Sequence, residues 1–348
     1  MKKRDCKIRG SASSAPFSTP RKFLGHICLV GLACLGCLGE FSGFSEGLLI
    51  RAEGAVLFAG PDTGQTTLEE ALHAAASGDI LSLSEGVHTC ASGYIAEKDL
   101  TLQGSSEGVT ILQTSETPGG VPDISVLTIK EGLWITLNNL HIRHGSNRNG
   151  GGIFLHRGSS LTMTNCTVSN NTALYYGGGI FVEDRNALDM TNCTIADNTA
   201  WNAVDTSSCG GGIAAFESAL HMTDCRVYRN SGAFGGGIYS QPYDTGDLLL
   251  QNCTFYANKA EKLGRSLCHH DNYRGVGFVA NSIFWGDSQT TQGEIFAPTP
   301  LTITCSVTNL QGEGNTSEDP HLGVLNNNGN PTETCVPDEG YPSPPRTP

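Results

Sequence analysis

An internal repeat in the centre of the chain constrains the fold more than any other feature. Residues 150–173 read GGGIFLHRGSSLTMTNCTVSNNTA, and residues 177–200 read GGGIFVEDRNALDMTNCTIADNTA. The Gly-Gly-Gly-Ile element begins at residues 150, 177, 210 and 235, and an Asn-Cys-Thr element or an Asp-Cys-Arg variant follows each copy. The spacing between these starting residues is typical of a solenoid. In a solenoid each unit is too small to bury its own core and stacks on its neighbours.

The apolar pattern within one repeat predicts short β-strands that meet at corners. Leu161 and Met163 alternate with polar residues, and Cys166 and Val168 alternate again after a shift of phase. Because side chains in a strand alternate with a period of two, a corner between two strands explains the shift. A third strand is expected at residues 153–155. We therefore predict an all-β fold, a single-stranded right-handed parallel β-helix of seven or eight coils over residues 66–310.

The ends of this solenoid need protection, because a terminal coil otherwise exposes its core and an unpaired strand edge. Residues 67–76 read TLEEALHAAA and have apolar residues at helical spacing, with Thr66 or Thr67 as the N-cap. We predict a short capping helix here, in which Leu68, Leu72 and Ala75 cover the first coil. Residues 39–65 are interpreted as a linker and the start of the cap.

Stacking of the coils brings equivalent residues into rows that run along the solenoid. One predicted row is a ladder of stacked amides at the corner before the cysteines, where each side chain bonds its neighbour and backbone groups left unpaired at the bend. A second row consists of small cysteines that point into the core. The expected corner ladder is Asn139, Asn165, Asn192, Asp224, Asn252 and Asn281, and the expected thiol row is Cys166, Cys193, Cys225 and Cys253.

These motifs resemble those of the bacterial polymorphic outer membrane protein (Pmp) repeat, whose two signatures are a GGA[ILV]-type element and an FxxN element. The second signature is intact at residues 255–258 and degenerate at residues 168–171, 195–198 and 227–230. The capping region also resembles the start of pectate-lyase-like β-helices, and residues 311–348 resemble a choice-of-anchor C-terminal segment. The resemblance implies an exported bacterial protein of the outer membrane, cell surface or periplasm.

The N-terminal 38 residues have the pattern of a targeting segment. Residues 1–22 carry seven basic side chains and one acidic one, and residues 23–38 read FLGHICLVGLACLGCL, with no Asp, Glu, Lys or Arg. This pattern predicts a signal peptide, and small residues before Cys34 and Cys37 resemble a lipoprotein processing site, with Cys37 slightly favoured. A buried helix or a short membrane anchor is the alternative.

The remaining chain is acidic. Subtracting the leader's residues from the totals leaves 14 basic and 33 acidic side chains, a net charge of −19. Such a chain is not expected to bind nucleic acid or an anionic membrane surface by electrostatics, so membrane attachment would depend on a lipid anchor.

Few residues suggest catalysis. Glu183, Asp184 and Arg185 follow a Gly-Gly-Gly-Ile strand and are weak catalytic candidates, but a solvated loop edge is the favoured interpretation. Residues 268–271, Cys-His-His-Asp, are predicted to form a loop in place of a fifth Gly-Gly-Gly-Ile and lack the spacing of a metal site. No metal or cofactor is expected. Cys209 and Cys268 are candidates for a disulfide.

We therefore predict a non-enzymatic scaffold that presents loops for adhesion, with a host or envelope protein or a glycan as partner. Two alternatives stay open. One is a polysaccharide lyase or hydrolase of the pectate-lyase-like superfamily, which would need acidic and basic side chains that converge on one groove. The other is a passive structural or antigenic surface protein.

Overall fold

The computed structural model describes residues 54–202, 207–242, 247–270, 277–286, 293–298, 301–304 and 306. The chain divides into two units, residues 1–50 and 51–348, and every described residue belongs to the second. The predictions for the leader, for Cys34 and Cys37 and for residues 311–348 lie outside the described residues. Within the described part, no helix has the length and apolar character that crossing a membrane requires.

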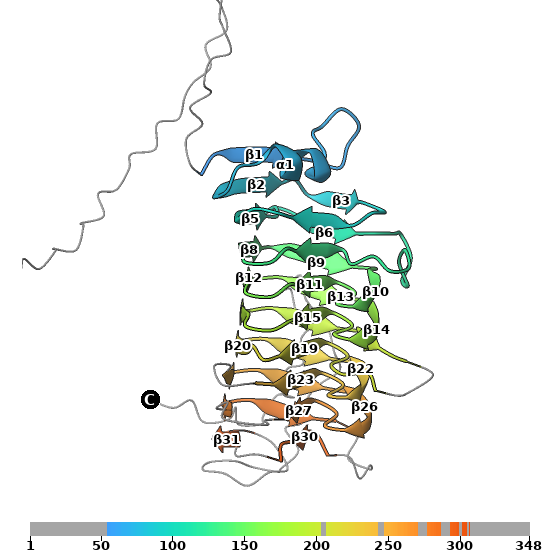
Figure 1. Ribbon diagram of the computed structural model, residues 1–348, viewed down its shortest axis with the longest axis vertical. Helices are drawn as coiled ribbons and strands as arrows, with labels where there is room; N and C mark the ends of the chain where they lie inside the picture. The colour runs from blue at the N-terminus through green and yellow to red at the C-terminus, as the bar shows by residue number, and fades with distance from the viewer. Residues whose placement is uncertain are drawn as a thin grey trace, which may run out of the picture. The chain divides into compact units, whose positions relative to one another are not determined.

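The second unit is a stack of coils whose strands form parallel sheets, with the cap at one end (Figure 1). The all-β prediction is confirmed, and eight strands in each of two sheets correspond to eight coils. The first sheet contains ten strands: β1 (Val56–Ala59), β2 (Asp79–Leu83), β5 (Leu100–Gln103), β8 (Trp134–Asn138), β12 (Ser160–Thr164), β16 (Ala187–Thr191), β20 (Ala219–Thr223), β24 (Leu248–Gln251), β28 (Gly277–Ala280) and β31 (Leu301–Thr304).

Two further parallel sheets of eight strands each run along the solenoid. The second sheet contains β3 (Gly86–Thr89), β6 (Thr110–Gln113), β9 (Leu140–Arg143), β13 (Thr167–Ser169), β17 (Thr194–Ala196), β21 (Arg226–Tyr228), β25 (Thr254–Tyr256) and β29 (Ile283–Trp285). The third contains β4 (Tyr94–Ala96), β7 (Leu127–Ile129), β11 (Ile153–Leu155), β15 (Ile180–Val182), β19 (Ile213–Phe216), β23 (Ile238–Gln241), β27 (Leu267–His269) and β30 (Ile295–Phe296).

The central coils contain a fourth strand that the sequence pattern did not predict. These strands form a five-stranded sheet between the second and third sheets along the chain (Figure 1). They are β10 (Ser146–Asn149), β14 (Thr172–Tyr176), β18 (Thr199–Ala200), β22 (Ser231–Phe234) and β26 (Lys259–Leu263). The central repeats have enough residues between the second corner and the glycines to extend this side of the coil, and parallel pairing with the next coil satisfies their backbone groups.

The predicted capping helix is α1 (Leu68–Ala74), which contacts β1, β2 and β4. Its N-cap is Thr67, whose hydroxyl accepts a hydrogen bond from the Glu70 amide at 3.2 Å, while the Glu70 carboxylate accepts one from the Thr67 amide at 2.9 Å. This reciprocal pair satisfies two amides that the helix itself leaves unpaired. Leu68 and Leu72 are buried on the first coil. The first strand, β1, lies within the segment predicted as linker.

The core is a continuous column of inward-facing side chains from the first three sheets. Cys166, Cys193, Cys225 and Cys253 lie in this column and are at most 1% exposed. All seven cysteines of the described residues are free thiols, so Cys209 and Cys268 form no disulfide in the structure. Small buried thiols pack here as apolar side chains.

The three glycines of each repeat have different roles. The first has a positive φ, as at Gly177 (+62°), which an L side chain rarely adopts. The second and third lie against the next coil, since a Cβ added to Gly178 would lie 2.4 Å from the Gly211 carbonyl oxygen. The repeat thus brings the backbones of successive coils closer than side chains would permit.

The prediction of a loop at residues 268–271 is wrong for its first two residues. Cys268 and His269 belong to the buried strand β27, and Asp271 lies outside the described residues. The preceding Gly-Arg-Ser-Leu takes the place of a fifth Gly-Gly-Gly-Ile, with Gly264 at a φ of +62°. The buried Arg265 side chain is accommodated by an ion pair with Glu294, with Nη2 and Oε1 2.7 Å apart. This pairing allows a charged residue at a position that is glycine in the other copies.

Candidate functional site

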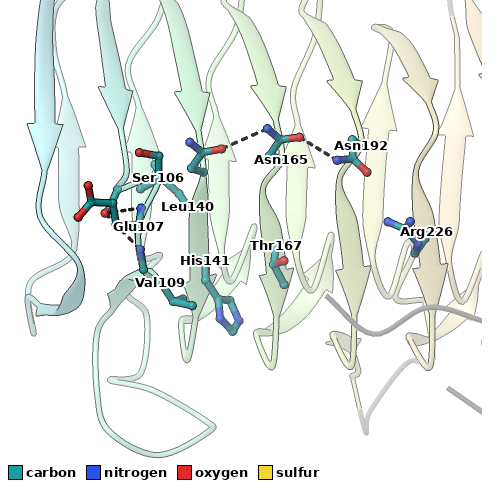
Figure 2. Close-up of a pocket in the computed structure, with 12 residues that line it drawn as sticks. Ser106, Glu107, Val109, Leu140, His141, Asn165, Thr167, Asn192 and Arg226 are labelled. Atoms are coloured by element: carbon teal, nitrogen blue, oxygen red, sulfur yellow. Dashed lines mark hydrogen bonds between the residues drawn. The ribbon is translucent and has the colours of Figure 1, made fainter. Parts of the chain in front are cut away.

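The predicted corner ladder lies at the turn from the first sheet to the second. Asn139, Asn165 and Asn192 have φ values of +54°, +54° and +51°, a conformation that asparagine tolerates better than most residues. Asn165 donates from Nδ2 to the Asn139 Oδ1 at 3.2 Å, and Asn192 donates to the Asn165 Oδ1 at 2.8 Å. The three amides thus form one hydrogen-bonded chain on the outside of the solenoid (Figure 2).

The rest of this ladder is less regular. Asn252 donates from Nδ2 to the Asp224 Oδ1 at 3.0 Å. The Oδ1 of Asn281 is buried and has no hydrogen-bond partner within the described residues. The continuous amide chain is therefore confined to the coils that contain Asn139, Asn165 and Asn192.

A second asparagine ladder, which the sequence analysis missed, lies in the interior. It consists of Asn171, Asn198, Asn230 and Asn258, the last residues of the FxxN-like elements. Asn198, with no exposed surface, donates from Nδ2 to the Val168 carbonyl at 2.9 Å and to the Asn230 Oδ1 at 3.0 Å. It is this ladder that bonds backbone groups at a bend. The recurring Asn at the end of each FxxN-like element was the signal that could have revealed it.

A groove with a volume of about 630 Å³ lies beside the exposed ladder. The corner and the outer face of the second sheet form its floor, and the segment of residues 105–109 forms a wall at one end (Figure 2). The lining residues are Ser105, Ser106, Glu107, Gly108, Val109, Asn139, Leu140, His141, Asn165, Thr167, Asn192 and Arg226.

The wall is held in one conformation by local hydrogen bonds. The Ser105 hydroxyl accepts bonds from the amides of Glu107 and Gly108 at 3.1 and 3.3 Å, and the Ser105 amide donates to the Thr110 hydroxyl at 3.0 Å. At its base, a Cβ on Gly104 would lie 2.1 Å from the Asn139 carbonyl oxygen. Close packing therefore ties the wall to the floor, and the groove is formed before any ligand binds.

The two permanent charges of the groove lie at opposite ends. Glu107 is on the wall, whereas Arg226 begins β21, three strands along the second sheet from His141 in β9 (Figure 2). Three steps of one strand spacing correspond to about 14 Å. Arg226 has no ion-pair partner within the described residues. The middle of the groove contains hydroxyl and amide groups without a permanent charge.

His141 is uncharged at neutral pH. Burial, followed by the nearby Arg143 and His144, lowers its pKa to about 4. Its Nε2 is hydrogen bonded to the Ser169 hydroxyl at 2.7 Å. An imidazole in this state offers polar contacts without adding a positive charge to the groove.

The low pKa of His141 predicts that acid weakens the fold. Above pH 6.5 the His141 imidazole is neutral in both the folded protein and the unfolded chain. Between pH 6.5 and 4 the unfolded chain takes up a proton at this imidazole before the folded protein does. We expect a loss of up to about 3 kcal/mol in the free energy of unfolding over this window. Burial also lowers the pKa values of His88 and His144, which adds a loss of stability of the same sign.

Urea unfolding at several pH values measures this loss of stability in acid, and His141→Gln should make the loss smaller. Superimposable pH profiles for the variant and wild type would contradict this assignment.

The weak catalytic candidates lie elsewhere. Glu183, Asp184 and Arg185 follow β15 at the turn from the third sheet to the first, and none of them lines the groove. Asp184 pairs with Arg157, and the Glu183 Oε2 lies 3.3 Å from the His156 Nδ1, so both carboxylates join neighbouring coils. Arg185 has a φ of +59° at this turn.

The groove offers one carboxylate, on Glu107, among its lining residues. Glycoside hydrolysis commonly uses two carboxyl groups on either side of the scissile bond. Within the described residues, no group of three or more His, Cys, Asp or Glu side chains is arranged to hold a metal ion.

Comparisons with known proteins give one matching family model and several similar solved structures. A family model described as a right-handed β-helix region matches residues 125–295. The crystal structure of a pectin methylesterase from Aspergillus niger is 16% identical, with a TM-score of 0.44, over 77% of this chain and 92% of that chain. A pectate lyase crystal structure is 10% identical, with a TM-score of 0.39, over 77% of this chain and 79% of that one. No curated protein gives a match. The parallel sheets and the matched region together show that the chain has the fold of a right-handed parallel β-helix.

Proposed function

We propose that this protein is an exported envelope or surface protein whose β-helix is a rigid, non-catalytic scaffold for glycan contact. The groove beside the exposed amide ladder is the proposed contact site. Export is supported by the basic and apolar leader of residues 1–38, and attachment to the envelope would use a lipid on Cys37 or Cys34. The observation that carries the proposal is the chain of amides on the floor of a preformed groove.

The amide ladder supports a ligand that carries its own amides. Each side-chain amide has two N–H donors and an oxygen with two acceptor sites, and the ladder bonds use only part of this capacity. Within the described part of the protein, both Nδ2 hydrogens of Asn139 are available at one end of the amide chain, and the Oδ1 of Asn192 is available at the other. An acetamido group offers one donor and one acceptor, so a glycan with N-acetylated sugars matches this floor.

The remaining surface of the groove also fits such a ligand. Val109 is 52% exposed on the wall and offers an apolar contact for an acetamido methyl group. Thr167 and the neutral His141 add hydroxyl and imidazole contacts in the middle. The absence of permanent charge between Glu107 and Arg226 favours an uncharged sugar chain, because a buried charge without a partner is costly.

Blocking the floor of the groove should weaken glycan binding by at least about tenfold. Thr167 lies in the middle of the floor, and Thr167→Arg would fill the groove with a long charged side chain. Thr162→Arg is the matched control, since Thr162 belongs to the same coil but faces solvent on the first sheet, outside the groove. The measurement is calorimetric titration with oligomers of β-1,4-linked N-acetylglucosamine.

Four outcomes distinguish the possibilities. Loss of binding in the Thr167 variant alone supports the groove as the contact site. Equal binding by both variants and wild type would place the contact elsewhere. Cleavage of the oligomers by the wild-type protein would favour the polysaccharide-enzyme alternative, and the absence of any binding would favour a passive structural role.

A further inference from the structure

A second hollow lies on the other side of the same wall. Its volume is about 690 Å³, and it shares Ser105, Ser106 and Glu107 with the groove. The remaining lining residues are Phe58, Ala59, Gly60, Gln65, Thr66, Ser82, Leu83, Ser84, Gln103 and Gly104. Because Ser105, Ser106 and Glu107 line both hollows, the two hollows adjoin across them, and we refer to this boundary as the ridge.

Phe58 is the most exposed side chain of this second hollow that could make a large apolar contact. It lies in β1 and is 74% exposed, and within the described residues no aromatic ring packs against it. Its neighbours in the strand register are Ser82 in β2 and then Gln103 in β5. An apolar ring thus borders a row of hydroxyl and amide groups on the outer face of the first sheet.

The surroundings of Phe58 are fixed by the fold. A Cβ on Gly60 would lie 1.4 Å from the Gln65 Oε1, which places this amide directly over the glycine backbone. Gln103 donates from Nε2 to the Gly104 carbonyl at 3.1 Å at the base of the wall. The Ser84 carbonyl accepts a bond from the Thr110 hydroxyl at 3.0 Å, which links this side of the wall to the strand that follows it.

We propose that Phe58 is the stacking platform of a second sugar subsite, and that one glycan chain occupies the groove and this hollow together. The inference rests on the proposed function of the groove. An exposed ring with adjacent amides and hydroxyls matches a sugar, whose ring presents C–H groups on its faces and hydroxyls at its rim. The side chain of Phe58 projects from the face of the first sheet and not from the strand edge, so it serves a ligand lying on that face.

The proposal predicts a dependence on ligand length. A short oligomer fills the groove alone, whereas a longer oligomer crosses the ridge and reaches Phe58. Phe58→Ala should therefore weaken binding of the β-1,4-linked N-acetylglucosamine hexamer by about tenfold and leave the affinity for the dimer unchanged. Trp134→Ala is the matched control, because Trp134 is also 74% exposed on the first sheet but lines neither hollow.

Calorimetric titration of the full chain with dimer and hexamer separates the two proposals. A selective loss of hexamer affinity in the Phe58 variant, with none in the Trp134 variant, supports the second subsite. Hexamer binding that depends on Thr167 but not on Phe58 overturns the second subsite and leaves the groove assignment intact. Equal losses for dimer and hexamer also overturn it, because a separate subsite cannot act on a ligand that does not reach it. No hexamer binding to the wild type overturns both.

Discussion

Gly178→Ala is expected to lower the free energy of unfolding by more than about 3 kcal/mol. The added Cβ would lie 2.4 Å from the Gly211 carbonyl oxygen and 2.5 Å from the Thr199 carbonyl carbon and oxygen. These are backbone atoms, which cannot rotate away as a side chain does. The hydrogen bond from the Gly178 amide to the Gly210 carbonyl, 3.1 Å long, holds the two coils at this spacing. Relief of the clash would therefore have to separate stacked coils.

Gly158→Ala is the matched control for this effect. Gly158 has a φ of +73° and no atom within 4 Å of an added Cβ, so its substitution introduces backbone strain without a clash. We expect a loss of about 1–2 kcal/mol there. Urea unfolding followed by circular dichroism compares the two variants. Equal losses would mean that crowding between coils is not what selects glycine at residue 178.

The repeat and its apolar alternation were sufficient to predict the solenoid, because each depends on a period that only stacked strands satisfy. Three consecutive glycines in a repeat are compatible with either a positive φ or close contact between coils. The structure assigns the first role to Gly177 and the second to Gly178. Which glycine has which role could not be predicted from three identical residues, because it depends on which glycine faces the next coil.

The two asparagine ladders show a similar limit. Asn165 and Asn171 belong to the same coil, and both recur in the next coil as Asn192 and Asn198. The first series was expected to bond backbone groups, but it lies outside at a positive φ, and the buried second series has that role. Which asparagine points inward depends on the local bend at each corner, and a positive φ at one residue changes the direction of the next side chain.

The groove could not be predicted because its parts come from different coils. The wall, residues 105–109, lies in an early coil where the repeat motifs are weak, whereas Arg226 follows the Asp224 variant of the ladder. Asn139, Asn165 and Asn192 were expected to be purely structural, but their outer surface faces a hollow. In a solenoid, residues separated by whole repeats become neighbours, so a site appears only when register and loop conformation are both known.

Asn198→Ala is expected to lower the free energy of unfolding by about 3–5 kcal/mol. The Asn198 side chain accepts hydrogen bonds from the Asn171 backbone amide at 3.1 Å and from its Nδ2 at 3.0 Å, and donates to the Val168 carbonyl. Its removal leaves buried donors and acceptors of two coils without partners. Each such group costs about 1–3 kcal/mol when water cannot reach it. Denaturant titration of the full chain measures the change.

Asn192→Gly is the control that distinguishes the loss of a buried asparagine from the loss of an exposed one. Asn192 is exposed, and glycine adopts its φ of +51° without strain, so the variant removes only the outer amide and its bond to Asn165. We expect a loss below about 1 kcal/mol. Similar losses in the two variants would contradict the division into an inner ladder that stabilises the coils and an outer one that does not. If the difference holds, the outer amides contribute little to the fold, and their regular spacing along the groove is better explained by contact with a ligand.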